Sequence, residues 1–176
     1  MKNSGFYYEF YNPSKTVCGV NCLAGAVERL PRLGLHNAFF VCDDIDKSTA
    51  VDEVRKAVNA VKIKTGAMYV ISEKAVCLDS LREMRNVYRV NNCDCIIACG
   101  DYKVINTANR LRLLLSAQVA RFEDVKGINA ARKKTDIPLV VIPTSVGISN
   151  VMTSSVAVKD DKGQTFECLS PLAWPH

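Results

Sequence analysis

The sequence predicts an α/β protein: a parallel sheet covered by helices on both faces, with a β-hairpin near each end of the chain. Through the middle of the chain, short apolar runs alternate with segments of helical periodicity. This order is typical of parallel strands joined by right-handed helical crossovers. The length of 176 residues suits one domain with a sizeable core, so we expect residues 1–176 to form a single domain.

The first third of the chain predicts a hairpin, a helix and a buried strand. Residues 6–18 (FYYEFYNPSKTVC) are rich in aromatic and β-branched types around an Asn-Pro turn, which favours two short strands. We expect Asn21 to cap a helix over residues 22–34. Residues 38–43 (AFFVCD) form a short apolar run that ends in acids, as expected for a buried parallel strand.

The central third predicts two further strand and helix pairs. Residues 50–62 carry valines at helical spacing, and residues 67–72 (AMYVIS) read as the next strand. A helix is expected from Leu78 through about Val87, because apolar residues recur on one face there. Residues 93–99 (CDCIIAC) form a third apolar strand that runs directly into a glycine.

The last third predicts one more helix, one more strand and a hairpin. Residues 104–116 have helical periodicity, and residues 138–145 (PLVVIPTS) form a fourth buried strand. Residues 154–168 are typical of a hairpin that turns at its Asp-Asp-Lys-Gly segment. Residues 117–136 give the weakest pattern, for which we expect a short helix and a surface loop.

Composition excludes several classes of protein. No apolar run approaches the ~20 residues that a membrane span needs, and the N-terminus has no apolar signal segment, so we expect a cytoplasmic protein. The eight cysteines form no CxxC pair, and only two histidines are present. We therefore expect buried free thiols and no bound metal.

The charge pattern gives little support for a polyanionic partner. The net charge is +5, and the basic residues are scattered, without interleaved aromatic residues. The scattered residues include Arg110 and Arg112, and solvated helix faces account for most of the set. We expect no binding to nucleic acid or to membranes.

Four segments, in order, resemble the iron-containing alcohol dehydrogenase family. They read FYNPSKTVCG, AFFVCD, CDCIIACGDYKVINTAN and IPLVVIPTSVGISNVMTSSVAVKD, and they span nearly the whole chain. Any one of these matches is weak, but four in the same order predict the fold. The resemblance implies a Rossmann-like N-terminal domain that would hold NAD or NADP.

The resemblance also assigns cofactor roles to particular positions. Asp43 matches the acid that binds the adenosine ribose, and Gly100 matches the first glycine of the phosphate turn. Thr144 and Ser145 match paired hydroxyl residues near the nucleotide, and Gly147 matches the glycine that follows them.

Departures from the family pattern concentrate at this cofactor site. The family's Gly-Gly-Gly-Ser turn reads Gly100, Asp101, Tyr102 and Lys103 here, and the family's next Asp is Asn106. At about 4 Å, a second negative charge is repelled by about 1 kcal/mol in water and about 4 kcal/mol at an effective dielectric constant of 20. We therefore expect Asp101 to weaken NAD(P) binding or abolish it; Tyr102 adds bulk, and Lys103 offsets part of the repulsion.

Three functional hypotheses remain open from the sequence. The family's metal ligands, an Asp and three His, lie in a following helical domain, and this chain ends near where that domain would begin. The first hypothesis is a truncated dehydrogenase-like domain, a pseudoenzyme that is not catalytic alone. It would form a dimer through its N-terminal hairpin or bind a separate partner chain.

The second hypothesis is a working NAD(P)-binding half of an alcohol or aldehyde oxidoreductase, completed by another chain. The third is a different small ligand in the altered crevice, lined by Asp101, Tyr102, Lys103 and Asn106. Its alternative is a collapsed crevice that Tyr102 fills.

Overall fold

The main sheet has four parallel strands in the order β2-β1-β3-β5. The strands are β1 (Asn37–Cys42), β2 (Lys64–Val70), β3 (Cys95–Gly100) and β5 (Leu139–Pro143). The computed structural model describes residues 13–43, 49–72, 76–116, 127–128, 137–145, 155–159 and 164–169. The expected parallel α/β architecture is confirmed.

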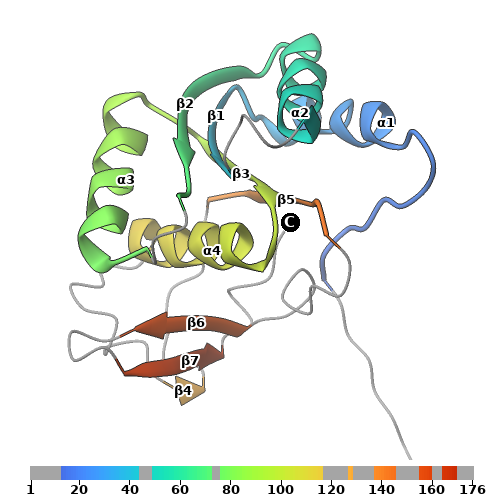
Figure 1. The fold of residues 1–176 in the computed structure, drawn as a ribbon. Helices are drawn as coiled ribbons and strands as arrows, with labels where there is room; N and C mark the ends of the chain where they lie inside the picture. The colour runs from blue at the N-terminus through green and yellow to red at the C-terminus, as the bar shows by residue number, and fades with distance from the viewer. Residues whose placement is uncertain are drawn as a thin grey trace, which may run out of the picture.

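Helices cover both faces of the main sheet (Figure 1). On one face lie α1 (Leu23–Val27), the 3-10 helix η1 (Leu30–Leu33) and α2 (Thr49–Ala60), and on the other lie α3 (Leu78–Val90) and α4 (Tyr102–Ser116). The central strands β1 and β3 are therefore buried on both sides, which explains why their sequences are apolar without alternation.

Successive side chains of β1 enter two separate cores. Phe40 packs with the valines of α2, while Phe39 packs with α3 and α4. Phe39 also meets Tyr88 of α3 edge to face, with ring centroids 5.9 Å apart. The period of two along the strand thus divides the interior between the two helical layers.

A second, smaller sheet lies beyond α4. It contains β4 (Gly127–Ile128), β6 (Ser155–Lys159) and β7 (Thr165–Leu169), in the order β4-β7-β6. β6 and β7 are antiparallel, which confirms the C-terminal hairpin. Helix α4 consequently lies between the two sheets and contacts β3 on one side and β6 on the other (Figure 1).

The N-terminal elements differ from the prediction. Asn21 does not cap a helix: its backbone φ is 57°, and Cys22, at the cap position of α1, makes no side-chain capping bond. The expected helix over 22–34 is divided into α1 and η1, because Pro31 lacks the N–H that a continuing helix needs. Residues 6–12 of the predicted hairpin lie outside the described residues, and residues 13–18 form no strand.

Two arginines of α4 are buried, so solvation does not explain them. Arg110 is 6% exposed and Arg112 is 2% exposed. The Arg112 Nε donates a hydrogen bond of 2.8 Å to the carbonyl of Ile137, and burial lowers the pKa of Arg112 to about 10. Helix α4 buries these polar side chains because its sides face two sheets and a neighbouring helix.

Within the described ranges, every helix is too short or too polar to cross a bilayer.

Candidate functional site

The carboxyl ends of three parallel strands meet at one edge of the main sheet. Asp43 follows β1, Asp101 follows β3 and Thr144 follows β5. The backbone N–H of Thr144 donates to the carbonyl of Gly100 at 3.1 Å, so the ends of β3 and β5 remain paired up to this edge. In open parallel sheets this edge is where ligands bind.

Gly100 is the residue around which the edge closes. A Cβ built on Gly100 would lie 2.5 Å from Cγ2 of Val104 and 2.7 Å from Oδ2 of Asp43. The Asp43 carboxylate and the first turn of α4 therefore pack directly over the bare Cα. The resemblance placed Asp43 and Gly100 in one site, and the structure brings them together.

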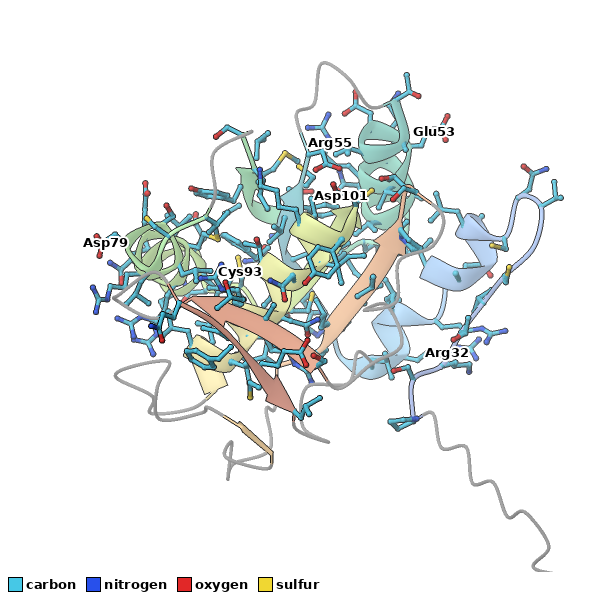
Figure 2. The ribbon with its side chains drawn as sticks, turned by 60° about the horizontal axis from the view of Figure 1, so that its bottom comes forward. Arg32, Glu53, Arg55, Asp79, Cys93 and Asp101 are labelled. Atoms are coloured by element: carbon cyan, nitrogen blue, oxygen red, sulfur yellow. The ribbon has the colours of Figure 1, made fainter. Side chains whose placement is uncertain are left out.

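Asp101 caps helix α4 with its own carboxylate. Its Oδ1 accepts hydrogen bonds from the backbone N–H groups of Lys103 at 2.8 Å and Val104 at 3.2 Å. These are the N–H groups that a helix N-terminus offers to an anion. Figure 2 labels Asp101 at the start of the helix. The carboxylate therefore binds the anion-binding groups of the turn from within the chain.

A second carboxylate occupies the same turn. The backbone N–H of Asp101 hydrogen bonds to Asp43. Burial and the negative charge of Asp101 raise the pKa of Asp43, and this outweighs the hydrogen bond and the positive charge of Lys103. Two acids of the chain thus take up the backbone donors at residues 101, 103 and 104.

We expect Asp43→Asn to stabilise the protein at neutral pH by less than about 1 kcal/mol, because the group is partly exposed. The folded state binds the Asp43 proton more tightly than the unfolded state, whose pKa is near the ordinary 3.8. The wild type therefore loses stability as pH rises through the raised pKa, whereas the amide of the variant does not titrate. Urea unfolding at several pH values measures the difference, which should vanish in acid; a constant difference contradicts the assignment.

Asn106 binds the small sheet through its side-chain amide. Its Nδ2 donates to the carbonyl of Ala157 at 3.0 Å, and its Oδ1 accepts from the Ala157 N–H at 3.0 Å. The amide thus satisfies both backbone groups of one residue in β6. An aspartate at this position lacks the donor for the second bond. Asn106 therefore makes a structural contact between α4 and β6.

Tyr102 and Lys103 line a hollow between α4 and the small sheet. The hollow has a volume of about 290 Å³, and Tyr102 is 44% exposed at its margin. The Lys103 Nζ donates to the carbonyl of Ser72 at 2.7 Å. Tyr102 lines this space and does not fill it, so the collapsed crevice considered above is not what the structure shows.

The remaining predicted site residues lie apart from this hollow. Thr144 lines a different groove, on the α1 and α2 side of the sheet, and Ser145 is exposed. Gly147 lies outside the described residues. The structure therefore divides the predicted site into three parts. The first is the turn at residues 100–104, here called the closed turn because Asp43 and Asp101 bind its backbone donors. The others are the hollow beside α4 and the groove beside β5.

The sequence prediction missed Thr107 and Arg110, which also line the hollow. Both lie within two turns of Lys103 on α4, at spacings that place residues on one helix face. That periodicity was the available signal. It gave no indication of burial, because Arg110 is covered by elements distant in sequence.

The groove near β5 is larger and mostly apolar. It has a volume of about 530 Å³ and is lined by the 15–19 segment, α1, η1, α2 and β5. Exposed apolar side chains lie around it: Val17 is 40% exposed, Leu33 is 61% exposed, and Val20, next to the lining residue Gly19, is 95% exposed. Exposed apolar residues gathered in this way are typical of interaction surfaces.

Most of the described cysteines are buried free thiols, as expected. Cys42 and Cys99 are register partners on neighbouring strands. Burial, with the nearby negative groups, raises the pKa of Cys42 to about 11 and that of Cys99 to about 12. Such thiols are unreactive at neutral pH. Among the described residues, no three His, Cys, Asp or Glu side chains form a group that could hold a metal ion.

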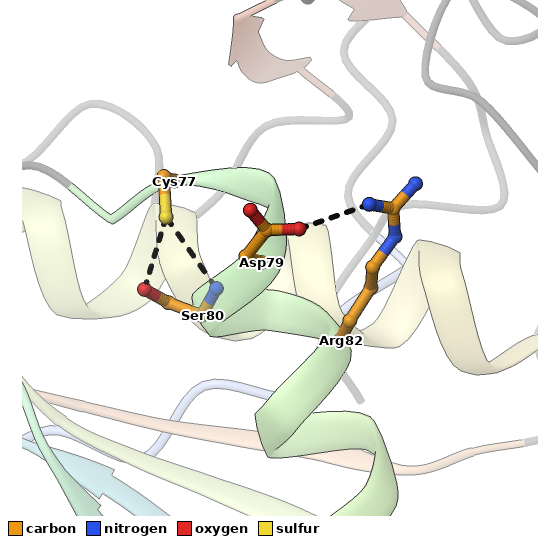
Figure 3. Close-up of polar contacts among 4 residues, drawn as sticks. All are labelled: Cys77, Asp79, Ser80 and Arg82. Atoms are coloured by element: carbon orange, nitrogen blue, oxygen red, sulfur yellow. Dashed lines mark hydrogen bonds and ion pairs between the residues drawn. The ribbon is translucent and has the colours of Figure 1, made fainter.

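Cys77 differs from the buried thiols in its exposure and hydrogen bonding (Figure 3). Its Sγ caps α3, at 3.5 Å from the Ser80 N and 3.2 Å from the Ser80 Oγ. These hydrogen bonds lower the pKa of the Cys77 thiol. Asp79 and Arg82 form an exposed ion pair on the same turn.

We expect iodoacetamide to alkylate Cys77 faster than Cys42 or Cys99, because the thiolate is more populated and accessible. Ser80→Ala should slow Cys77 alkylation several-fold at neutral pH by removing the hydroxyl hydrogen bond. Mass spectrometry of time points gives the rates. An unchanged rate in the Ser80 variant contradicts the role assigned to that hydroxyl.

Comparisons with known proteins identify the family and the fold of this chain. A family model described as iron-containing alcohol dehydrogenase matches residues 13–176. Alcohol dehydrogenase 4 of Schizosaccharomyces pombe is 24% identical over 153 residues, which cover 86% of this chain and 36% of that protein. The chain therefore spans little more than a third of that relative.

Solved structures show the same fold. An alcohol dehydrogenase from Oenococcus oeni superposes with a TM-score of 0.84 at 19% identity, covering 96% of this chain and 44% of that chain. A sulfoacetaldehyde reductase from Bifidobacterium kashiwanohense, solved in complex with NAD+, has a TM-score of 0.77 at 15% identity and covers 97% of this chain and 45% of that chain. At these identities the likeness supports the fold alone.

Proposed function

The chain belongs to the iron-containing alcohol dehydrogenase family, and from this premise we propose that it is a dehydrogenase-like domain whose dinucleotide turn is closed by its own carboxylates. The domain binds NAD(P) weakly or not at all and does not catalyse alone. Its role is to associate with a second copy of itself. One observation carries the proposal: the Asp101 carboxylate accepts the N–H groups of Lys103 and Val104.

A bound diphosphate would have to displace this carboxylate from the two N–H groups, and the displaced carboxylate would still lie next to the phosphate. The donors that would hold the phosphate oxygens are occupied, and the acid would lie within contact distance of the phosphate charge. Repulsion of about 1 to 4 kcal/mol corresponds to a loss of affinity from several-fold to about a thousandfold. Gly100 has no side chain, so it would still allow a phosphate to approach the backbone closely. The Asp101 carboxylate prevents this, because it occupies the backbone donors that would bind the phosphate.

We expect Asp101→Gly combined with Tyr102→Gly to create or strengthen NAD binding by at least about tenfold. The double variant frees the N–H groups of residues 103 and 104 and removes both the charge and the bulk. Isothermal calorimetry with NAD and NADP measures the affinities of the wild type and the variant. Glycine at the cap costs the helix only a few tenths of a kcal/mol, so the fold should persist.

Asp79→Gly is the matched control, because it removes an exposed acid from the first turn of a different helix. It should leave NAD affinity unchanged. If the double variant gains no affinity while remaining folded, the location of the phosphate turn is wrong. If the wild type binds NAD at micromolar concentration, the inference that the carboxylates close this turn to NAD is wrong.

The groove near β5 supports self-association. Val17, Val20 and Leu33 expose apolar surface around this groove, and Val17 belongs to residues 6–18, where the sequence predicts a hairpin and a dimer contact. We expect a dimer by light scattering, which Val20→Lys combined with Leu33→Lys should convert to monomer. Val90→Lys, at a 79% exposed position on α3, is the control and should leave the dimer intact. A monomeric wild type contradicts this part of the proposal.

The second candidate is an NAD(P)-binding half of an alcohol or aldehyde oxidoreductase, with the metal-binding domain supplied by another polypeptide. The position of Asp43 favours it, since its carboxylate lies at the end of β1 beside Gly100, where the resemblance places the ribose-binding acid. Wild-type NAD or NADP binding at millimolar concentration or tighter favours this candidate over the first.

A further inference from the structure

The hollow between α4 and the small sheet has walls from four separate elements. Its residues come from the first turns of α4, the segment before α3, β6 and β7 (Figure 1). They are Val76, Tyr102, Lys103, Asn106, Thr107, Arg110, Ala157, Val158 and Thr165. The volume of about 290 Å³ is at the lower end of the range for small-molecule sites.

Two basic side chains contribute to the lining of this hollow. Lys103 and Arg110 line it, and no Asp or Glu is among its lining residues in the described ranges. Asp101 does not line it, and that carboxylate is held on the helix N-terminus by two backbone N–H groups. The nearest acid of the turn is thus fixed outside the hollow by its own hydrogen bonds.

Both cations are held in place by backbone carbonyls. The Lys103 Nζ lies 2.7 Å from the carbonyl of Ser72, and an Arg110 terminal nitrogen lies 3.0 Å from the carbonyl of Val76. Burial lowers the pKa of Arg110, which means that its guanidinium is poorly solvated by water. An anion in the hollow would interact with a positive charge that the protein has already partly desolvated.

The remaining lining selects the rest of the ligand. Val76 and Val158 contribute apolar surface, and the Tyr102 ring stands at the margin. Thr107 and Thr165 carry hydroxyl groups, whereas the Asn106 amide is bound to Ala157. This arrangement suits a compact molecule with one negative group and one apolar part.

We propose that this hollow binds a small organic carboxylate, with its charge near Lys103 and Arg110 and its apolar part against Val76 and Val158. The proposal goes beyond the closed dinucleotide turn and does not depend on it. It assigns a ligand to a space that the closed turn leaves open.

The test is an NMR titration of the whole chain with benzoate and with benzamide, its neutral analogue of the same shape. We expect benzoate to shift the backbone amides of Asn106, Thr107 and Val158, and to bind at least about tenfold more tightly than benzamide. Equal binding of the two compounds, shifts confined to other regions, or no shift at about 10 mM benzoate overturns the proposal.

Three variants locate the charge. Lys103→Gln should weaken benzoate about tenfold, because one of the two cations is lost, and Lys103→Arg should retain binding. Lys56→Gln, at an exposed position on α2, is the matched control and should have no effect. Lys103 is partly exposed, so both substitutions there should fold. Benzoate affinity unchanged in Lys103→Gln overturns the proposal.

Discussion

Replacing Gly100 with alanine should destabilise the protein by about 2 to 3 kcal/mol. The new Cβ would lie 2.5 Å from the Val104 Cγ2 and 2.8 Å from the Val104 Cβ. Val104 is β-branched and held in the first turn of α4, so it has little freedom to move away. The Asp43 carboxylate, at 2.7 Å, would have to leave the Asp101 N–H as well. Urea unfolding measures the loss as a lower midpoint at an unchanged slope.

Gly25→Ala is the matched control for this substitution. Gly25 lies in α1, and a Cβ there meets nothing within 4 Å. Alanine should be neutral or stabilise by up to about 1 kcal/mol, since it lowers the entropy of the unfolded chain and favours helix. If the two substitutions changed stability equally, close packing would not be the reason that residue 100 must be glycine.

The second large effect is expected from Asn106→Asp, which restores the residue type of the family pattern. The Ala157 N–H keeps its acceptor, but the Ala157 carbonyl loses its donor and then faces a carboxylate. Leaving one group unsatisfied beside a negative charge costs about 2 kcal/mol at neutral pH. We therefore expect lower unfolding free energy and faster hydrogen exchange at residues 155–159.

The destabilisation should decrease in acid. Facing a carbonyl raises the pKa of the introduced carboxyl group in the folded variant, so the folded state binds the proton more tightly than the unfolded state. Stability of the variant is then highest below that pKa and falls as pH rises through it, because only the protonated acid can donate to Ala157. Asn86→Asp, at an exposed position on α3, is the control. A loss of unfolding free energy that does not depend on pH would contradict the pairing of the Asn106 amide with the backbone of Ala157.

The main sheet could be predicted because burial on both faces requires a continuous apolar run within the sequence of each central strand. β1 and β3 are covered by helices on both sides, so their sequences are continuous apolar runs that end in Asp or Gly. The start of β2 was missed, because Lys64 is an exposed residue at the edge of the sheet. The two-residue strand β4 is defined only by its pairing with β7, which lies far along the chain.

At the site, the sequence indicated the residues but not what they bind. Asp101 was interpreted only as a charge that repels phosphate, because the family pattern has glycine at this position. The sequence predicts that helix α4 begins at residue 104. It begins at Tyr102, and this makes Asp101 its cap. Asn106 pairs with a residue 51 positions away, and no local pattern carries that information. The burial of Arg110 likewise depends on elements that come together only in the folded chain.

The position of α4 between two sheets has a consequence for synthesis on the ribosome. β6 and β7 follow α4 in the chain, so they emerge from the exit tunnel after the helix and the first three strands. During that interval the side of α4 that β6 later covers would be bare. The nascent domain therefore passes through a stage at which a chaperone would find an apolar helix face, and slowing translation before residue 155 should lengthen that stage.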